Sequence, residues 1–329
     1  MKLRLSGLCL ALSLTLATTT SMAADPAPAA SAGRPQMGSF GIDLSARDPS
    51  VRPGDDFNRY ASGHWISSYQ LKPDEASYGS FNALRDQADE QVRGLIEGLR
   101  QRTDLAPGSN AQKIRDLYAS YMNRAARDAA GITPLSPMLD RIAAIDSKAA
   151  LIDAFGRAAV DGSDAPFGLY VGTDRKNPDR YQVGLGVGGL GLPDRDYYLD
   201  GDARFVKIRA AYLDHIQRML GFAGITGTDA KARAEAVLAL ETAMARPQWD
   251  KVRLRDRDKT WNVRTFAQLQ EQYPGYDWAA QLRAQGMPQP TDLNISTPDV
   301  IQPVIALIDA TPLSTWRDYL TFHAVDGNA

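Results

Sequence analysis

Three histidines, His64, His215 and His323, are the first candidates for metal or proton-transfer chemistry in this 329-residue sequence. A helical zinc site needs two histidines four residues apart on one helix face, with a glutamate between them as general base. The sequence contains no His-Glu-x-x-His, and its closest histidines, His215 and His323, are 108 positions apart. A zinc site assembled from three distant histidines stays an alternative, but structural or surface roles are favoured.

A glycine run, Gly184 to Gly189, has the G-x-G-x-x-G spacing after a predicted strand. That spacing is typical of loops that hold a dinucleotide pyrophosphate at a helix N-terminus. Here Leu190 to Pro193 intervenes before any helix, and no strand with an acidic end follows about twenty positions later. We therefore interpret the run as a flexible strand exit. The sequence also lacks Gly-Lys-Ser/Thr, which excludes a P-loop.

Four aspartates surround a tyrosine pair and suggest either a calcium loop or a paired-carboxylate site. They are Asp194, Asp196, Asp200 and Asp202, around Tyr197 and Tyr198. Because the calcium-loop spacing and its terminal glutamate are missing, helix N-caps are the favoured interpretation.

Two further segments have an ordinary and a functional interpretation. Lys251 to Lys259 carries five basic and two acidic residues, which suits either steering of an acidic ligand or a salt-bridged surface. We favour the surface. Asn294-Ile-Ser296 fits a glycosylation acceptor, which matters only in a eukaryotic secretory pathway.

Charge and leader place the chain among exported proteins that do not bind nucleic acid. The 37 basic and 39 acidic side chains give a net charge of −2, which disfavours binding driven by phosphate neutralisation. Residues 1–23 are predicted to be a signal peptide, with Lys2 and Arg4 before an apolar run and Ser21-Met22-Ala23 as the cleavage site. We expect a periplasmic or secreted product with no membrane span after signal cleavage. Cys9, the sole cysteine, lies in the leader, so the mature chain is expected to lack disulfides and thiolate sites.

Helical periodicity dominates the rest of the chain. Residues 24–39 are rich in Ala, Pro and Gly and are predicted to be a flexible linker. Apolar residues then recur at spacings of three and four, which predicts an amphipathic helix from Phe81 to Leu99 and another from Phe205 to Met219, stopped by Gly221. Further helices are expected at 114–121, 135–145, 148–160, 230–244, 263–271, 299–308 and from 313 onward. Residues 167–173 and 181–187 predict two strands around Asn177-Pro178. The expected fold is mainly α with one small β-hairpin near residues 167–187.

Six blocks, in order, resemble the neprilysin family of zinc metalloendopeptidases, particularly its bacterial secreted branch. The first runs from Pro53 to Trp65 and is similar to the family signature P-x-x-D-F-Y-x-Y-A-x-G-x-W. The others are Tyr78 to Phe81, Gly189 to Tyr198, Arg255-Asp256 with Thr260 to Asn262, Tyr273 to Trp278, and Thr311 to Leu313 with Trp316, Tyr319 and Leu320. The resemblance spans residues 40 to 322.

The resemblance implies a helical, lid-type N-terminal domain over residues 40–329, truncated before the catalytic half. The family's Asn-Ala-x-x motif, zinc helix, third zinc ligand and late histidine lie in that other half, and the zinc-helix pattern His-Glu-x-x-His does not occur in this sequence. We therefore assign no catalytic residue and no metal ligand here, and the substrate-binding residues stay unknown. Zinc and peptide substrates are expected for a full-length member, with no zinc bound by this chain.

Two departures from the family pattern limit what can be transferred. Animal members have cysteines where this chain has Gly54 and Ser62. Neprilysin has an arginine that contacts the substrate's C-terminal carboxylate where this chain has Ser77, so a bidentate clamp is absent.

Three functions remain open at this stage. The first is the N-terminal portion of a zinc endopeptidase, inactive alone. The second is a non-catalytic exported protein that binds peptides, and the third is a hydrolase that uses the Asp194 to Asp202 carboxylates. If the first holds, we expect the helix from Leu313 to expose an apolar face whose partners come from later sequence; its residues are Trp316, Tyr319, Leu320 and Phe322.

Overall fold

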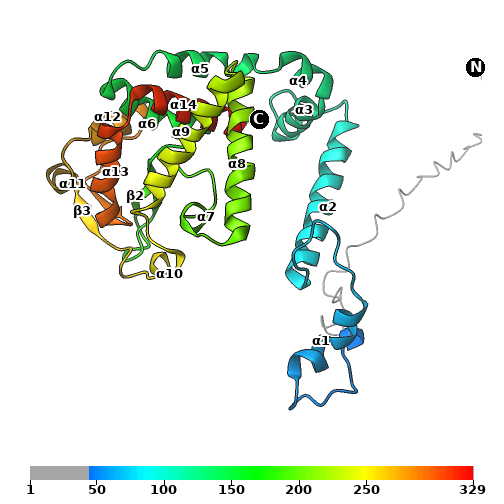
Figure 1. Cartoon of the computed structure of the whole chain (residues 1–329). Helices are drawn as coiled ribbons and strands as arrows, with labels where there is room; N and C mark the ends of the chain where they lie inside the picture. The colour runs from blue at the N-terminus through cyan, green and yellow to red at the C-terminus, as the bar shows by residue number, and fades with distance from the viewer. Residues whose placement is uncertain (1–43, 329) are drawn as a thin grey trace, which may run out of the picture. The chain divides into compact units, whose positions relative to one another are not determined.

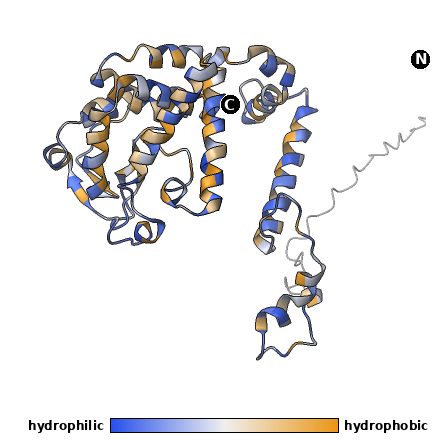
Figure 2. Ribbon diagram, viewed as in Figure 1, coloured by the Kyte–Doolittle hydropathy of each residue, from blue (hydrophilic) through white to orange (hydrophobic). Residues whose placement is uncertain are grey.

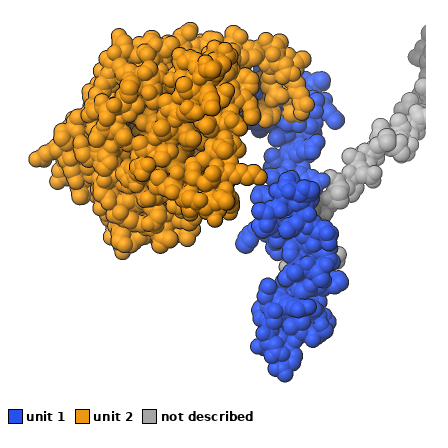
Figure 3. All heavy atoms as spheres, viewed as in Figure 1, with its two compact units in different colours: residues 1–118 blue, residues 119–329 orange. Residues whose placement is uncertain are grey.

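The computed structural model describes residues 44–328, which divide into two compact units. Unit 1 ends at Tyr118 and unit 2 begins at Ala119, as coloured in Figure 3. Each unit is treated by itself below. The predicted signal peptide and linker lie outside the described residues, and the expected domain start at residue 40 stays a prediction.

Unit 1 is a short series of helices that begins with a capped turn. Its elements are η1 (Leu44–Ala46), α1 (Phe57–Ser68), α2 (Ser80–Arg100) and α3 (Asn110–Met122), the last of which runs past the unit boundary. Asp56 caps α1 by accepting the backbone N–H of Arg59. The rings of Trp65, Tyr69 and Tyr78 stack on one another near the end of α1 and the start of α2. The ring centroids of Trp65 and Tyr69 are 5.0 Å apart, and those of Tyr69 and Tyr78 are 4.6 Å apart.

Unit 1 has no interior of its own. The apolar spacing correctly predicted α2, yet no residue from 44 to 118 is buried. On α2 the side chain of Phe81 is 89% exposed and that of Leu95 is 72% exposed. Apolar positions recur along this helix among hydrophilic ones in Figure 2. An amphipathic helix gains stability by burying its apolar stripe, and the residues of unit 1 do not bury this one.

Unit 2 contains the remaining helices, drawn in Figure 1. They are α4 (Arg124–Ala130), η2 (Thr133–Leu135), α5 (Ser136–Ala143), α6 (Lys148–Asp161), α7 (Asp196–Leu199), α8 (Ala203–Phe222), α9 (Gly227–Ala245), α10 (Lys251–Leu254), α11 (Phe266–Gln272), α12 (Trp278–Ala284), α13 (Pro298–Ala310) and α14 (Leu313–Asn328). The predicted stop of α8 at Gly221 is one residue early, because Gly224, with φ +87°, supplies the left-handed turn. No helix of the described part is long and apolar enough to cross a membrane.

The predicted hairpin is confirmed as β1 (Phe167–Thr173) and β2 (Tyr181–Val187), which pair antiparallel. The sheet is larger than expected, with four strands in the order β1-β2-β4-β3. Strand β4 (Asp292–Ile295) pairs parallel with β2 and antiparallel with β3 (Val263–Thr265). The helix expected from residue 263 therefore begins as a strand, and α11 starts after Thr265, which forms a capping box with Gln268.

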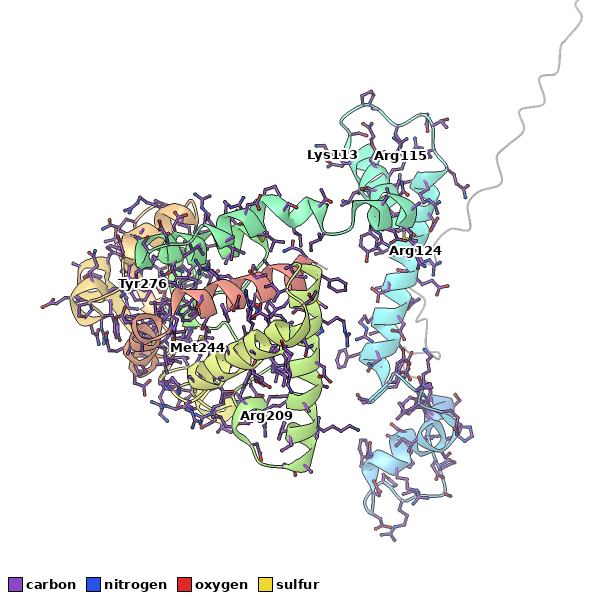
Figure 4. All side chains as sticks on the ribbon, turned by 45° about the horizontal axis from the view of Figure 1, so that its top comes forward. Lys113, Arg115, Arg124, Arg209, Met244 and Tyr276 are labelled. Atoms are coloured by element: carbon purple, nitrogen blue, oxygen red, sulfur yellow. The ribbon has the colours of Figure 1, made fainter. Side chains whose placement is uncertain are left out.

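The core of unit 2 lies between the sheet and its helices. Helix α6 packs against α12 so closely that a Cβ on Gly156 would lie 2.5 Å from the carbonyl oxygen of Gln281. Met244 of α9 and Tyr276, both labelled in Figure 4, belong to the same buried apolar cluster.

The C-terminal helix contradicts the sequence-based expectation that its apolar face is exposed. Trp316, Tyr319 and Phe322 are all 0% exposed, and α14 packs against α5, α6, α8 and α9. The ring of Phe155 on α6 meets Trp316 edge-on at 5.2 Å. The prediction was wrong because the partners of this face come from earlier sequence, within unit 2.

Candidate functional site

A cluster of ionisable side chains centres on the core of unit 2, where four helices and two loops meet; one member, Asp164, lies at the surface with its side chain 65% exposed. We call it the Glu241 cluster; its members are Asp164, Tyr198, Tyr212, Glu241, Tyr319 and His323. Glu241 is 0% exposed and His323 is 2% exposed. Charged groups with so little exposure persist only when they are paired and hydrogen-bonded.

Glu241 of α9 accepts hydrogen bonds at both carboxylate oxygens. Tyr198 of α7 donates to Oε2 at 2.7 Å, and Tyr212 of α8 donates to the same oxygen at 2.8 Å. His323 of α14 contacts Oε1 through Nε2 at 2.8 Å. The other imidazole nitrogen, Nδ1, lies 3.5 Å from Asp164 Oδ2. Since carboxylates face both nitrogens, the ring suits the doubly protonated form, in which both nitrogens donate.

The electrostatics favour a protonated His323. Burial acts to lower the pKa of His323, but hydrogen bonds to Asp164 and Glu241 outweigh it and raise that pKa to about 9. The hydrogen bond to His323 holds the pKa of the Asp164 carboxyl below its usual value. Burial and the charge of Glu241 raise the pKa of Tyr198 and Tyr212, which therefore stay protonated as donors.

The cluster fixes the loop that joins β2 to α7, residues 188–195. Tyr319 donates to the carbonyl of Gly189 at 2.9 Å, and the N–H of Leu192 donates to Tyr198 at 2.9 Å. Gly189 has φ +76°, and a Cβ there would lie 2.5 Å from the Tyr319 hydroxyl. A Cβ on Gly191 would lie 2.0 Å from the Tyr212 hydroxyl. The glycines of this block are therefore required by the close approach of the tyrosines.

Two arginines complete the support of this loop and of α7. Arg195 donates to the carbonyl of Gln248. Arg209 of α8, labelled in Figure 4, donates to the carbonyls of Tyr197 and Asp200, both at 2.8 Å. The block from Gly189 to Tyr198 is thus an anchored turn, and the hydrogen bonds of the Glu241 cluster hold it in position.

The closed surroundings of Glu241 and His323 decide what the pair can do. With exposures of 0% and 2%, neither side chain can touch a substrate from solvent. Acid–base catalysis needs contact with the reacting group, so the geometry supports positioning of backbone rather than catalysis.

The three histidines are not brought together. His64 lies exposed on α1. His215 of α8 binds Asp326 of α14 through Nε2 at 2.6 Å, and His323 belongs to the Glu241 cluster. Among the described residues, no group of three or more His, Cys, Asp or Glu side chains has the arrangement to hold a metal ion. The described residues thus do not fit a zinc site.

The glycine and aspartate motifs have structural roles. Gly184 lies in β2 beneath the ring of Tyr170, whose Cζ would be 2.3 Å from a Cβ at that position. Asp194 and Asp200 accept N–H groups of nearby residues, and Asp202 accepts the N–H of Arg204 at the start of α8. The N-cap interpretation holds for Asp202 of α8, whereas Asp196 lies in the first turn of α7 and Asp200 follows the last residue of α7. Gly184 to Val187 belong to β2, and the loop that follows is anchored rather than flexible.

The basic segment and the glycosylation motif also have structural explanations. Lys251 pairs with Asp196 at 3.5 Å, and Arg253 pairs with Asp299 at 3.0 Å. Asn294 is 6% exposed in β4, where its amide donates to the Thr260 carbonyl and accepts the Asn262 N–H. Ser77 is exposed in the loop before α2.

Sequence reasoning missed Glu241 as the centre of this cluster. Its signal was present, because Val237, Glu241 and Met244 recur at spacings of four and three on one helix face. A lone carboxylate in an apolar stripe needs a buried cation. His323 repeats the pattern, following Trp316 and Tyr319 on the buried face of α14.

Comparisons with known proteins identify the family. The N-terminal model of Peptidase family M13 matches residues 53–329. Endothelin-converting enzyme-like 1 of Mus musculus is 29% identical over 302 residues, covering 86% of this chain and 38% of that protein. Endothelin-converting enzyme 1 of Homo sapiens is 26% identical over 297 residues, covering 86% of this chain and 37% of that protein.

A solved structure gives the same result. The zinc metalloprotease ZMP1 of Mycobacterium tuberculosis, in complex with an inhibitor, is 36% identical with a TM-score of 0.76, covering 86% of this chain and 43% of that one. The fold and sequence together define a peptidase-family N-terminal region. The chain belongs to Peptidase family M13, and it spans about two fifths of the length of these relatives. This confirms the resemblance stated from the sequence.

Proposed function

We propose that this chain is the N-terminal portion of a zinc-dependent metalloendopeptidase that cleaves peptides, and that it is inactive alone. The observation that carries the proposal is the family match over residues 53–329, together with the similarity to ZMP1, a zinc metalloprotease. The described residues offer no zinc donor set. We therefore assign zinc chemistry to polypeptide that corresponds to the remaining part of the relatives.

Unit 1 supports the idea that more polypeptide is needed. It has no buried residue, while Phe81 and Leu95 of α2 and Leu117 of α3 are more than two thirds exposed. Fully burying such a side chain stabilises a fold by about 1.5–3 kcal/mol. A covering surface from outside unit 1 accounts for these apolar side chains, and the relatives are long enough to contribute to it.

The decisive test combines a gene sequence with an assay. The DNA downstream of the Ala329 codon is read for His-Glu-x-x-His, and peptide cleavage is measured with zinc for the chain alone and for the chain co-expressed with that downstream product. We expect the motif to be encoded and cleavage to require both parts. Zinc-dependent cleavage by the chain alone would contradict the proposal.

The alternative is a non-catalytic, exported peptide-binding protein. Its support is the completed core of unit 2, in which α14 is buried within the described chain. A natural stop codon after Ala329, together with a monodisperse chain that binds peptides and no downstream zinc helix, would favour this alternative.

Export is also part of the proposal. It rests on the order of basic residues, apolar run and small residues in positions 1–23. Mass spectrometry of the chain made in a bacterial host should show cleavage after Ala23 and recovery from the periplasm or medium. Intact Met1 in cytoplasmic material would contradict it.

A further inference from the structure

Helix α14 is tied to helices α8 and α9 by three ionisable pairs, and to the loop after α6 by the contact of His323 with Asp164. Asp318 accepts from Arg233 of α9 at 3.2 Å, His323 meets Glu241 of α9 at 2.8 Å, and Asp326 meets His215 of α8 at 2.6 Å. Of these, the His323–Glu241 pair is the buried one, since the side chains of His215 and Asp326 are 35% and 39% exposed. A helix whose inner face carries a histidine in contact with two carboxylates depends on the charge of that histidine.

We propose that the Glu241–His323 pair is a pH-dependent anchor that holds α14 and the loop of residues 188–195 in place while His323 carries a proton, and releases them in alkaline medium. The geometry provides the coupling. Glu241 accepts hydrogen bonds from the hydroxyls of Tyr198 and Tyr212, which lie beside the loop. Tyr319, one turn before His323, donates a hydrogen bond to the loop carbonyl of Gly189. The Tyr319 and His323 rings lie 4.3 Å apart.

The groups that face His323 restrict the titration to one site. Asp164, in the loop after α6, and Glu241, on α9, are its carboxylate neighbours. Tyr198 on α7, Tyr212 on α8 and Tyr319 on α14 have pKa values raised by burial, so they stay neutral through pH 9. Burial raises the pKa of Asp318 from a carboxyl value of 3.8, and Arg233 stays charged. The charge of this neighbouring pair therefore changes in acidic and not in alkaline medium.

The direction of the pH dependence follows from the difference between the pKa of His323 in the unfolded and the folded chain. The pKa of His323 is 6.5 in an unfolded chain and is raised to about 9 in the fold. Its contribution to stability is therefore fully present below pH 6.5 and is lost as pH rises through about 9. Deprotonation removes the imidazolium and leaves Glu241 buried opposite a neutral ring. A shift of this size corresponds to a change on the order of a hundredfold in the opening equilibrium.

Hydrogen exchange at several pH values tests the proposal on the full chain. Amide exchange is followed by mass spectrometry from pH 6.5 to 9.5 and divided by the intrinsic rate at each pH. We expect protection in residues 313–328 and 188–199 to fall on the order of a hundredfold across this range. The protection of residues 266–284, in α11 and α12, should fall much less over the same pH range. Uniform protection of α14 from pH 6.5 to 9.5 would overturn the proposal.

Variants separate the anchor from general alkaline loosening. In the double variant Glu241→Gln/His323→Gln both side chains are uncharged, so residues 313–328 should lose most of the pH dependence of their protection; the His215–Asp326 pair of α14 remains. The matched control is His64→Gln, which removes an exposed histidine on α1 and should keep the full pH dependence. An unchanged pH dependence in the double variant would overturn the proposal.

A direct titration keeps the proposal falsifiable if the double variant does not fold. The ring protons of the three histidines in the wild-type chain are followed by NMR, with His64 and His215 assigned from the single glutamine variants. We expect the remaining histidine, His323, to lose its proton well above pH 6.5. Titration of His323 at or below pH 6.5 would show that the anchor does not hold a proton and would overturn the proposal.

Discussion

Units 1 and 2 carry apolar helices of similar periodicity, but they differ in where the apolar faces go. In unit 1, Phe81 is 89% exposed on α2, and no residue from 44 to 118 is buried. In unit 2, Phe322 is 0% exposed on α14 and packs against Tyr212 at a ring distance of 5.8 Å. Periodicity therefore predicts a helix in both places and does not say what covers it.

The difference also separates two kinds of charge. Unit 1 has ion pairs in solvent, such as Arg102 with Asp104 at 2.7 Å, whose side chains are 52% and 68% exposed. Unit 2 encloses Glu241 and His323 in its core. The first kind is screened by water and contributes little, whereas breaking the second kind leaves a buried charge. Unit 2 should therefore resist unfolding by itself, and unit 1 should not.

The largest contrast is expected between two phenylalanines. Phe322→Ala should lower the free energy of unfolding of unit 2 by about 3–5 kcal/mol, because it leaves a cavity in the core. Phe81→Ala is the matched control and should change the stability of this chain very little, because its ring is exposed. Urea unfolding followed by tryptophan fluorescence measures both. Equal losses would remove the distinction between the units.

The next contrast removes one partner of an ion pair from each unit. His323→Ala should cost about 3–5 kcal/mol, because Glu241 is left buried and unpaired. Arg102→Ala, in a solvent-exposed pair, should leave the melting temperature unchanged. Both are read by thermal unfolding at pH 6.5. A His323→Ala variant as stable as wild type would show that the core does not depend on the pair.

Alanine substitutions at two helix glycines should change stability in opposite directions. Gly156→Ala should destabilise unit 2 by about 1–3 kcal/mol, since the new Cβ meets Gln281 O at 2.5 Å and Ala284 Cβ at 2.6 Å. Gly94→Ala on α2 meets nothing within 4 Å and should favour the helix by about 0.5–1 kcal/mol. Urea midpoints test the first, and helix content by circular dichroism tests the second. A stabilising Gly156→Ala would show that α6 and α12 pack less closely than described.

Sequence patterns predicted the elements better than their packing. The strands at 167–173 and 181–187 were predicted at their observed bounds, because β-branched and aromatic residues flank a turn at Asn177-Pro178. The strands β3 and β4 were missed, since three or four residues carry no readable period and their pairing joins Val183 to Leu293, far along the chain.

The site was predictable in its parts and not in its assembly. The block from Gly189 to Tyr198 was singled out from the family resemblance, and the structure adds the reason for its glycines, the hydroxyls of Tyr319 and Tyr212. The Glu241–His323 pair was missed because its members come from helices 82 positions apart. Spacing within one helix places a residue on the inner face, but only tertiary packing supplies its partner.

Hydrogen exchange of the full chain at pH 6.5 tests most directly the claim that unit 2 buries a core of its own and unit 1 does not. Stability varies along a chain with the buried contacts that each segment makes, so protection maps the covered segments. We predict strong protection in α6, α9 and α14, including residues 316–325, and rapid exchange throughout α2, residues 80–100. Strong protection of α2 in a monomer, equal to that of α14, would contradict the account.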